Sequence, residues 1–323
     1  MFRARAQTCM FFAIVHDRCT RVCPTRYSSF KIINSRTAFP DLTFHNIRFD
    51  TSYLMTKANR HRALVTGASA GIGAEFARQL AARGCDLVLT ARRAECLQAL
   101  ASELRAAHAI AVDVIVDDLA DPAAPVRIAA AATQDGRAVD VLVNNAGYGV
   151  PGRYDKVAWD VHARFMQVLV TAPLALCHLL LPSMRERGYG RIVNVASLAG
   201  LVPGTPGNTL YGPAKAFLVR VSQGLALENR ACGIHVCALC PGFTHSEFHD
   251  VSQARELVSR LPRWMWMDAD EVVRRGLDAV DRGRVVCVPG RVNRAIKVLA
   301  DLLPDRAALA MVGRRSKDFR VRE

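Results

Sequence analysis

The sequence predicts an α/β fold: a doubly wound parallel sheet of seven strands with helices on both faces. Short apolar runs alternate with longer stretches of helical spacing from His61 onward, which is typical of such a sheet. The first apolar run ends in a glycine-rich turn, and a helical pattern follows it directly. A composition of 51% hydrophobic and 22% charged residues excludes a disordered chain, a collagen-like fibre and a mucin-like stalk.

Seven apolar runs are expected to form the strands of this sheet. Helical patterns fill the intervals, and neither an internal repeat nor a low-complexity tract interrupts residues 60–290. One domain over residues 55–290 therefore accounts for the whole sheet. The predicted strands lie at residues 63–66, 86–90, 110–116, 140–144, 191–196, 234–239 and 284–288.

Residues 1–54 precede this domain and are interpreted as a disordered extension or as the product of a wrongly assigned start. Met55 begins the run that leads directly into the first strand, which is where an initiator methionine would stand. The segment holds 8 Lys and Arg against 3 Asp and Glu, so a transit peptide is the alternative.

The net charge of +14 is concentrated at the two ends of the chain. Residues 55–281 carry 24 basic against 22 acidic side chains, whereas residues 282–323 carry 11 against 4. A duplex-reading domain gathers its basic residues on one folded face, so no nucleic-acid partner is expected. Binding of nucleic acid or membrane through the basic ends is kept as an alternative. No uninterrupted apolar stretch reaches the roughly 18–20 residues of a transmembrane helix.

Residues 291–323 form a basic C-terminal tail with an amphipathic pattern. Val292, Ile296, Leu299 and Leu303 recur at helical spacing. The favoured interpretation is that this tail closes the substrate pocket or a subunit interface. Peripheral contact with an anionic membrane surface is the alternative.

The ten cysteines stand at irregular places, which indicates a reducing compartment and a cytoplasmic protein. Cys237 and Cys240 have metal-like spacing, but they lie in an apolar run and no second pair completes four ligands. We therefore expect a core strand there and no metal site.

A dinucleotide cradle is predicted at the turn after the first strand. Glycines leave room where the backbone must approach a pyrophosphate, and the N-terminus of the next helix supplies free N–H groups and a positive dipole end. The order strand, turn, helix is the context that such a motif requires. The turn reads Thr66-Gly67-Ala68-Ser69-Ala70-Gly71-Ile72-Gly73.

Five further motifs follow the glycine turn along the chain. They are Asp118-Leu119, Asn144-Asn145-Ala146-Gly147, Ser197, Tyr211-Gly-Pro-Ala-Lys215 and Pro241-Gly242. In order and spacing, the six motifs resemble the single-domain short-chain dehydrogenase/reductase family over about residues 60–245. The resemblance implies a Rossmann-type sheet, cofactor contacts from these segments, and a homodimer or homotetramer.

The catalytic chemistry is predicted for Ser197, Tyr211 and Lys215. Tyr211 and Lys215 are four residues apart on a helical pattern, so both project from one helix face. A nearby ammonium favours the phenolate, so Lys215 is expected to tune the Tyr211 pKa. Ser197 follows a strand at its carboxyl end, where it can hydrogen-bond a carbonyl oxygen that becomes negative. The resemblance implies that Tyr211 transfers the proton and that Lys215 also binds the nicotinamide ribose.

Leu169 departs from the family pattern. The run Met166-Gln-Val-Leu169-Val-Thr-Ala-Pro173 has leucine where the family commonly has the asparagine of a water relay to the lysine. Gln167 is two residues away and is expected to face elsewhere. The alternative to an active enzyme is therefore a catalytically weak scaffold or sensor that holds NADP(H).

The end of the second strand predicts a preference for NADP(H) over NAD(H). Ala91 occupies the position where an acidic residue would accept hydrogen bonds from both ribose hydroxyls of NAD(H). Arg92 follows, and its planar guanidinium can donate two hydrogen bonds to the 2′-phosphate of NADP(H). Asp118 is expected to bind the adenine, as the resemblance implies. Without such a ligand, Arg92 and Arg93 would simply begin a solvated helix.

The substrate is expected to be a lipophilic carbonyl compound or alcohol. In the family, the region after Pro241-Gly242 forms a mobile lid. Here it contains Trp264, Met265, Trp266 and Met267, which would offer an apolar wall or else pack the lid onto the body. The sequence thus predicts an NADP(H)-dependent oxidoreductase that interconverts a carbonyl and an alcohol.

Overall fold

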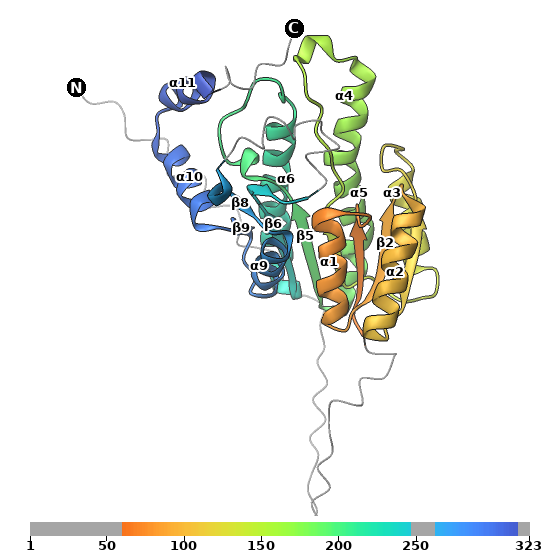
Figure 1. The fold of residues 1–323 in the computed structure, drawn as a ribbon. Coiled ribbons are helices and arrows are strands. Elements are labelled where there is room, and N and C mark those ends of the chain that lie inside the picture. The colour runs from red at the N-terminus through yellow and green to blue at the C-terminus, as the bar shows by residue number, and fades with distance from the viewer. Residues whose placement is uncertain (1–59, 247–261, 316–323) are drawn as a thin grey trace, which may run out of the picture. The chain divides into compact units, whose positions relative to one another are not determined.

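A computed structural model describes residues 60–246 and 262–315 of the chain, so the interpretations of residues 1–54, of the lid residues 247–261 and of residues 316–323 lie outside it. The described residues form a parallel seven-stranded sheet in the order β3-β2-β1-β4-β5-β6-β9 (Figure 1). The strand order reverses between β1 and β4, which makes the fold doubly wound and confirms the predicted fold class. The strands are β1 (Arg62–Thr66), β2 (Asp86–Ala91), β3 (Val112–Val116), β4 (Val141–Asn144), β5 (Gly190–Val195), β6 (Ile234–Leu239) and β9 (Val286–Cys287).

Helices cover both faces of the sheet. Side chains of α1, α2 and α9 join one buried cluster, and those of α3, α4, α5 and α6 join another on the opposite face. These helices are α1 (Gly71–Ala82), α2 (Ala94–His108), α3 (Ala124–Thr133), α4 (Trp159–Met166), α5 (Ala172–Arg187), α6 (Tyr211–Asn229) and α9 (Ala269–Asp281). Two further helices end the described chain, α10 (Arg291–Leu302) and α11 (Asp305–Arg315).

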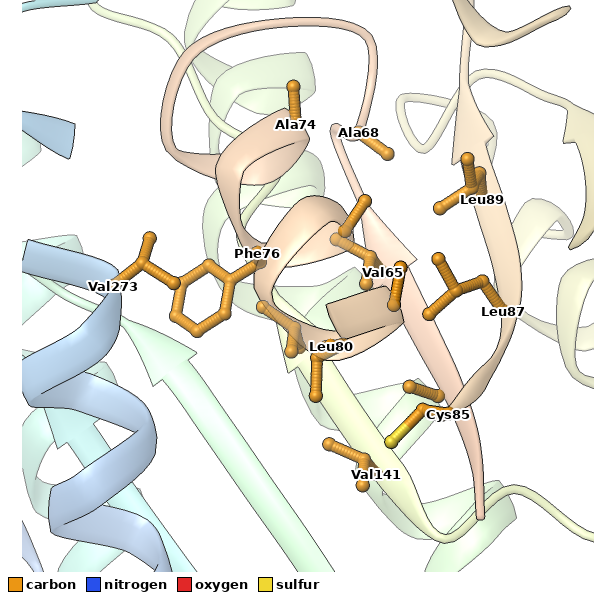
Figure 2. Close-up of a cluster of buried hydrophobic side chains, with 14 of the residues drawn as sticks. Val65, Ala68, Ala74, Phe76, Leu80, Cys85, Leu87, Leu89, Val141 and Val273 are labelled. Atoms are coloured by element: carbon orange, nitrogen blue, oxygen red, sulfur yellow. The ribbon is translucent and has the colours of Figure 1, made fainter. Parts of the chain in front are cut away.

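The first face is packed by aliphatic side chains from the strands and by one aromatic ring. Figure 2 shows Phe76 of α1 beside Val273 of α9, with Val65 and Leu87 on the strands behind the helix. Phe76, Val65, Leu87 and Val273 have no solvent-exposed surface. Because every strand here except the edge strands is covered on both sides, the strands read as continuous apolar runs.

Residues 159–187 form one helical stretch that, by length and composition alone, could cross a membrane. In the fold this stretch is a core element, because Phe165, Leu176, Leu180 and Met184 are buried in the second cluster. A buried helix of this kind passes the same hydropathy criterion as a membrane span.

A second, two-stranded sheet lies after β6, and the sequence pattern did not predict it. Phe243 pairs with Trp266 and Thr244 with Met267, which forms β7 (Phe243–Thr244) and β8 (Trp266–Met267). Two-residue strands carry no period of their own, so only the tertiary contact reveals them.

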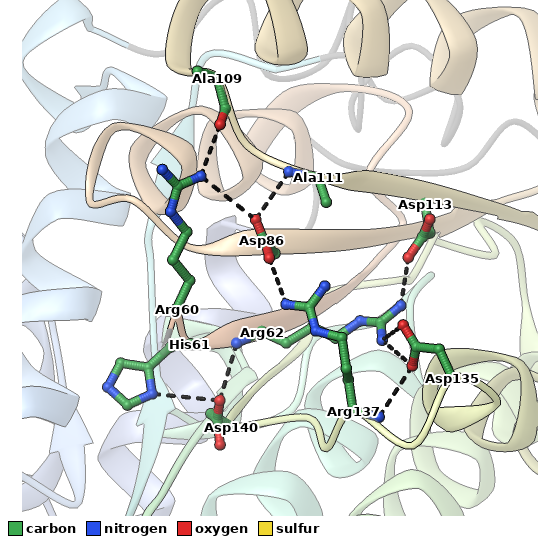
Figure 3. A network of polar contacts seen from close by, with 10 residues as sticks. All are labelled: Arg60, His61, Arg62, Asp86, Ala109, Ala111, Asp113, Asp135, Arg137 and Asp140. Atoms are coloured by element: carbon green, nitrogen blue, oxygen red, sulfur yellow. Dashed lines mark hydrogen bonds and ion pairs between the residues drawn. The ribbon is translucent and has the colours of Figure 1, made fainter. Parts of the chain in front are cut away.

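Charged side chains at the amino ends of the strands form a network that links β1, β2 and β3 (Figure 3). The Arg62 guanidinium is 3% exposed and donates to Asp113 and Asp135, with Nη1 to the Asp135 Oδ1 at 2.6 Å. Asp86, at the start of β2, pairs with Arg137 and accepts from the Ala111 N–H at 2.9 Å. A buried arginine is stable only with such partners.

Replacing Arg62 with methionine is expected to lower the free energy of unfolding by about 2–3 kcal/mol, because two carboxylates lose a shared cation at the base of the sheet. Chemical denaturation measures this change. Arg78→Met is the matched control, since the Arg78–Glu103 pair is about half exposed and should contribute less than about 1 kcal/mol. Equal losses in the two variants would contradict a structural role for the buried network.

Candidate active site

The glycine turn between β1 and α1 lies against the end of β4. Thr66 Oγ1 accepts from the backbone N–H groups of Asn145 at 3.0 Å and Ala146 at 3.1 Å. The Asn145 side-chain amide donates to the carbonyl oxygens of Thr66 at 3.0 Å and Gly67 at 3.2 Å. These bonds hold the predicted cofactor residues of both segments together.

Two glycines of the turn are required by its geometry. Gly67 has a φ of +65°, which L side chains rarely adopt. A Cβ on Gly73 would lie 2.2 Å from the Gly67 carbonyl oxygen and 2.4 Å from Asn145 Nδ2. The turn therefore passes within van der Waals contact of α1. No side chain caps the N-terminus of α1 and its first turn has no acidic residue, so its positive end faces the turn.

Ser197, Tyr211 and Lys215 lie together at the carboxyl end of β5. A side-chain hydrogen bond joins Ser197 and Tyr211. Lys215 Nζ lies 5.7 Å from the centre of the Tyr211 ring and donates to the Val195 carbonyl oxygen at 2.7 Å. The predicted placement of Tyr211 and Lys215 on one face of a helix, α6, is therefore what the structure has.

Burial sets the pKa values of this group. Desolvation raises the pKa of Tyr211 to about 12, and the hydrogen bond with Ser197 offsets part of that rise. Desolvation also lowers the pKa of Lys215 to about 8. Burial and the hydrogen bond with Ser197 are the causes of the Tyr211 shift, so the expected effect of Lys215 on the Tyr211 pKa stays a prediction.

Leu169 is buried next to Lys215. A Cβ on Gly147 would lie 3.7 Å from Leu169 Cδ1 and also 3.7 Å from Lys215 Nζ. Leu169 belongs to a π-helical turn, Gln167–Thr171, where the Ala172 N–H bonds the Gln167 carbonyl five residues back. Such turns are frequent at functional sites, and no spacing rule applied to the sequence could have located this one.

The residues after β2 contact the glycine turn through Arg93. Its guanidinium donates to the Ser69 hydroxyl at 3.2 Å and to the Ser69 carbonyl oxygen at 3.3 Å. Arg92, the residue singled out in the sequence, is exposed beside it. Sequence reasoning missed the contact between Arg93 and Ser69, although the pair of arginines was its visible signal.

Asp118 and Leu119 follow β3 as predicted and differ in their surroundings. Leu119 is buried, whereas the Asp118 carboxylate accepts from the Ala120 N–H at 3.0 Å and lies 3.6 Å from Arg164. The Asp118 side chain is partly exposed. It follows the carboxyl end of β3 and so lies at the same edge of the sheet as the glycine turn.

Pro241 and Gly242 lie between the turn that follows Ser197 and the C-terminal helix α10. The Pro241 carbonyl accepts from the Leu198 N–H at 2.8 Å, one residue after Ser197. A Cβ on Gly242 would lie 2.3 Å from Oδ1 of Asn293, a buried residue of α10. Asn293 is a second residue that sequence reasoning missed, because its role depends on a contact across 51 positions of the chain.

The apolar segment after Gly242 is partly stacked and partly exposed. The Trp266 ring stacks on His245 with 4.8 Å between centroids and lies 5.6 Å from Phe243. Trp264 is exposed. Met267 contacts Asn293 through its sulfur at 3.6 Å. Trp266 and Met267 thus pack onto the body, while Trp264 faces solvent.

Two hollows border these residues. A small one touches Tyr211 and is also lined by Val150, Phe165 and Leu210. A cavity of about 610 Å³ begins at Gly200, three residues after Ser197, and continues between α6 and the helices α10 and α11. Among residues 60–246 and 262–315, no group of three His, Cys, Asp or Glu side chains could hold a metal ion.

Comparisons with known proteins agree on one family. The sequence model of the short chain dehydrogenase family matches residues 61–256. An uncharacterized oxidoreductase of Myxococcus xanthus is 33% identical over 79% of this chain and 98% of its own length. Serine 3-dehydrogenase of Agrobacterium fabrum is 37% identical over 57% of this chain and 72% of its own length.

Solved structures give the same result. A short-chain dehydrogenase from Sphingobium yanoikuyae in complex with NADPH has a TM-score of 0.66 and 33% identity, covering 76% of this chain and 97% of that one. The bulky-bulky ketone specific alcohol dehydrogenase from Comamonas testosteroni has a TM-score of 0.63 and 32% identity, covering 76% of this chain and 96% of that one.

Proposed function

The chain belongs to the short-chain dehydrogenase family and is an oxidoreductase, and on that premise we propose that it reduces a lipophilic carbonyl compound with NADPH. The arrangement of Ser197, Tyr211 and Lys215 beside the glycine turn carries the proposal. The same groups serve the reverse oxidation of the alcohol when Tyr211 is ionised.

The residues of the turn fit a dinucleotide. Gly67 and Gly73 leave no side chain between the backbone and a bound pyrophosphate, and a Cβ at either position would overlap neighbouring atoms at 2.2–2.8 Å. The uncapped N-terminus of α1 adds the positive end of a helix dipole at the same place. Bound there, the cofactor would supply the hydride.

The chain's own residues manage the proton. With a pKa near 12, Tyr211 keeps its proton at neutral pH. It can donate that proton to the oxygen of the carbonyl group whose carbon receives the hydride. The Ser197 hydroxyl is joined to the same phenol and can hydrogen-bond that oxygen as it becomes negative. Lys215, held on the Val195 carbonyl, contributes positive charge beneath the ring.

A lipophilic substrate is favoured by the groups that surround Tyr211. Val150, Phe165 and Leu210 line the small hollow that touches Tyr211, beside the polar residues Asn208 and Thr209. Phe243 and His245 follow Gly242 closely, and both rings contact the Trp266 ring of β8, Phe243 at a tilt and His245 by stacking. Apolar walls with a few polar groups are usual for small-molecule pockets. The similarity to a bulky ketone dehydrogenase supports the same class of substrate.

The proposed function is tested by the oxidation of NADPH in the presence of a panel of bulky apolar ketones and aldehydes, with polar aldehydes as the matched set. Turnover with the apolar compounds is the expected result. Turnover restricted to polar aldehydes would reject the substrate class. Tight binding of NADPH without turnover on any compound would instead support a cofactor-holding protein in which Leu169 has disabled the relay.

The preference for NADPH over NADH rests on the two arginines after β2. Replacing Arg92 with alanine is expected to raise the KM for NADPH by about 10- to 100-fold and to leave the KM for NADH nearly unchanged, because only the 2′-phosphate needs the guanidinium. Steady-state kinetics with both cofactors measure the difference. Arg274→Ala, another exposed arginine but on α9, is the control. Equal rises for both cofactors would contradict the assignment.

We place the catalytic domain at residues 55–290, with residues 1–54 as an extension and residues 291–323 as a C-terminal tail that contributes Asn293. We also expect a cytoplasmic homodimer or homotetramer. The intact mass of the natural protein tests the first boundary, and light scattering tests the assembly.

A further inference from the structure

The helix α10 carries an apolar stripe on the side that faces away from the body. Asn293 is buried against Gly242, and Ile296 and Ala300 are partly buried, so these residues mark the inner side. On the outer side Val298 is 53%, Leu299 50% and Leu302 75% exposed. At 100° per residue these three side chains point within one sector, opposite Asn293.

The next helix packs toward the body. Ala308 of α11 is buried, and Leu309 lines the cavity between α6 and the two C-terminal helices, so neither belongs to the outer side of α10. Figure 1 shows α10 and α11 together at the edge of the molecule remote from α2 and α3. The outer stripe therefore consists of three large aliphatic side chains on α10, where an unpartnered helix in water would place polar ones.

Positive charge accompanies this surface. Arg291, Arg294 and Arg306 are exposed on the two helices. Lys297 Nζ pairs with Asp301 Oδ2 at 2.5 Å, which offsets both charges. The other acidic residue among residues 291–310 is Asp305. Over residues 282–323 the sequence holds 11 basic against 4 acidic residues, in contrast to the nearly balanced body.

From this arrangement we propose that the outer side of α10, together with the exposed arginines of α10 and α11, binds anionic lipid bilayers. The exposed leucines and valine enter the boundary between headgroups and acyl chains, and the arginines contact the lipid phosphates. The helices lie in the plane of the interface and do not span the bilayer.

A second copy of the chain is the other candidate for this surface, and the observations favour it less. A standard protein interface buries roughly 800 Å² per partner, which is more than three partly exposed aliphatic side chains supply by themselves. Two copies would also bring the same basic residues face to face, with only Asp301 and Asp305 among residues 291–310 to offset the repulsion of like charges.

The experiment is flotation of the full-length protein with vesicles of phosphatidylcholine alone and of phosphatidylcholine mixed with phosphatidylserine. We expect binding to the mixed vesicles and little to the neutral ones. The double variant Leu299→Gln/Leu302→Gln should lower the partition coefficient by about tenfold or more, because two leucines no longer enter the interface. Arg291→Glu/Arg294→Glu and added salt should weaken binding as well.

Matched controls come from the same chain. Leu227 of α6 is 76% exposed, as Leu302 is 75%, so Leu227→Gln should leave vesicle binding unchanged. Arg274→Glu of α9 is the control for charge. All variants are compared for helical content and for NADPH binding, so that misfolding is recognised.

Three results would overturn the proposal. The first is no binding of the wild-type protein to anionic vesicles, and the second is binding that survives Leu299→Gln/Leu302→Gln. The third is a fall in molecular mass of that variant in size-exclusion chromatography, without any vesicle binding by the wild type, which would assign the surface to a second copy.

Discussion

Replacing Tyr211 with phenylalanine is expected to lower kcat for ketone reduction by about 10²- to 10⁴-fold, the usual contribution of a positioned acid, while the affinity for NADPH stays nearly unchanged. The substitution removes only the hydroxyl, which is the group that would give its proton to the substrate oxygen. The ring keeps its place above Lys215, where the ammonium lies 5.7 Å from its centre.

The measurement is single-turnover reduction together with a separate titration of NADPH binding. Tyr189→Phe is the matched control, because Tyr189 is also a partly buried tyrosine with a raised pKa but lies at the start of β5, beside His61. A Tyr211→Phe enzyme that keeps more than about a tenth of wild-type kcat would remove Tyr211 from the role of acid.

The pH profile is a second readout of the same assignment. A phenol with a pKa of about 12 stays protonated across neutral pH, so reduction should not lose its acid there. Lys215 has a pKa of about 8 and loses its positive charge as the pH rises through that value. Reduction should therefore weaken above about pH 8, and alcohol oxidation, which needs the phenolate, should improve at alkaline pH.

Local spacing in the sequence was enough to predict which catalytic side chains could meet. Four residues separate Tyr211 from Lys215, and a helix brings such a pair to one face. The end of an apolar run placed Ser197 at the carboxyl edge of the sheet. The glycine turn was recognisable because strand, turn and helix follow one another directly in the sequence. Of the residues predicted to hold the pyrophosphate, only Asn145 and its neighbours come from another part of the chain.

Contacts across the chain could not be predicted in the same way. Arg93 meets Ser69 from the next strand, and Asn293 fills the space left by Gly242 from a helix that the sequence assigned to a tail. The direction of the Tyr211 pKa also escaped prediction, because burial decides it and burial is a property of the fold. The strands themselves were predicted because residues buried on both sides read as apolar runs.

Gly73→Ala is expected to have the second large effect, a loss of about 3 kcal/mol or more in stability together with a fall of about 100-fold or more in NADPH affinity. The added methyl group would lie 2.2 Å from the Gly67 carbonyl oxygen and 2.4 Å from Asn145 Nδ2. Relief requires α1 to move away from the turn or Asn145 to leave it. Either movement breaks the bonds from the Asn145 amide to Thr66 and Gly67, which hold the turn against β4.

Gly224→Ala separates this clash from the general effect of adding a methyl group. Gly224 lies inside α6, and a Cβ there would meet nothing within 4 Å. Because alanine is favoured over glycine within a helix by up to about 1 kcal/mol, this control should be neutral or stabilising. Denaturation and NADPH titration of both variants give the result. If Gly73→Ala matched the control in both measurements, the turn would not approach α1 as closely as the structure has it. The assignment of the turn as the pyrophosphate-binding site would then be rejected.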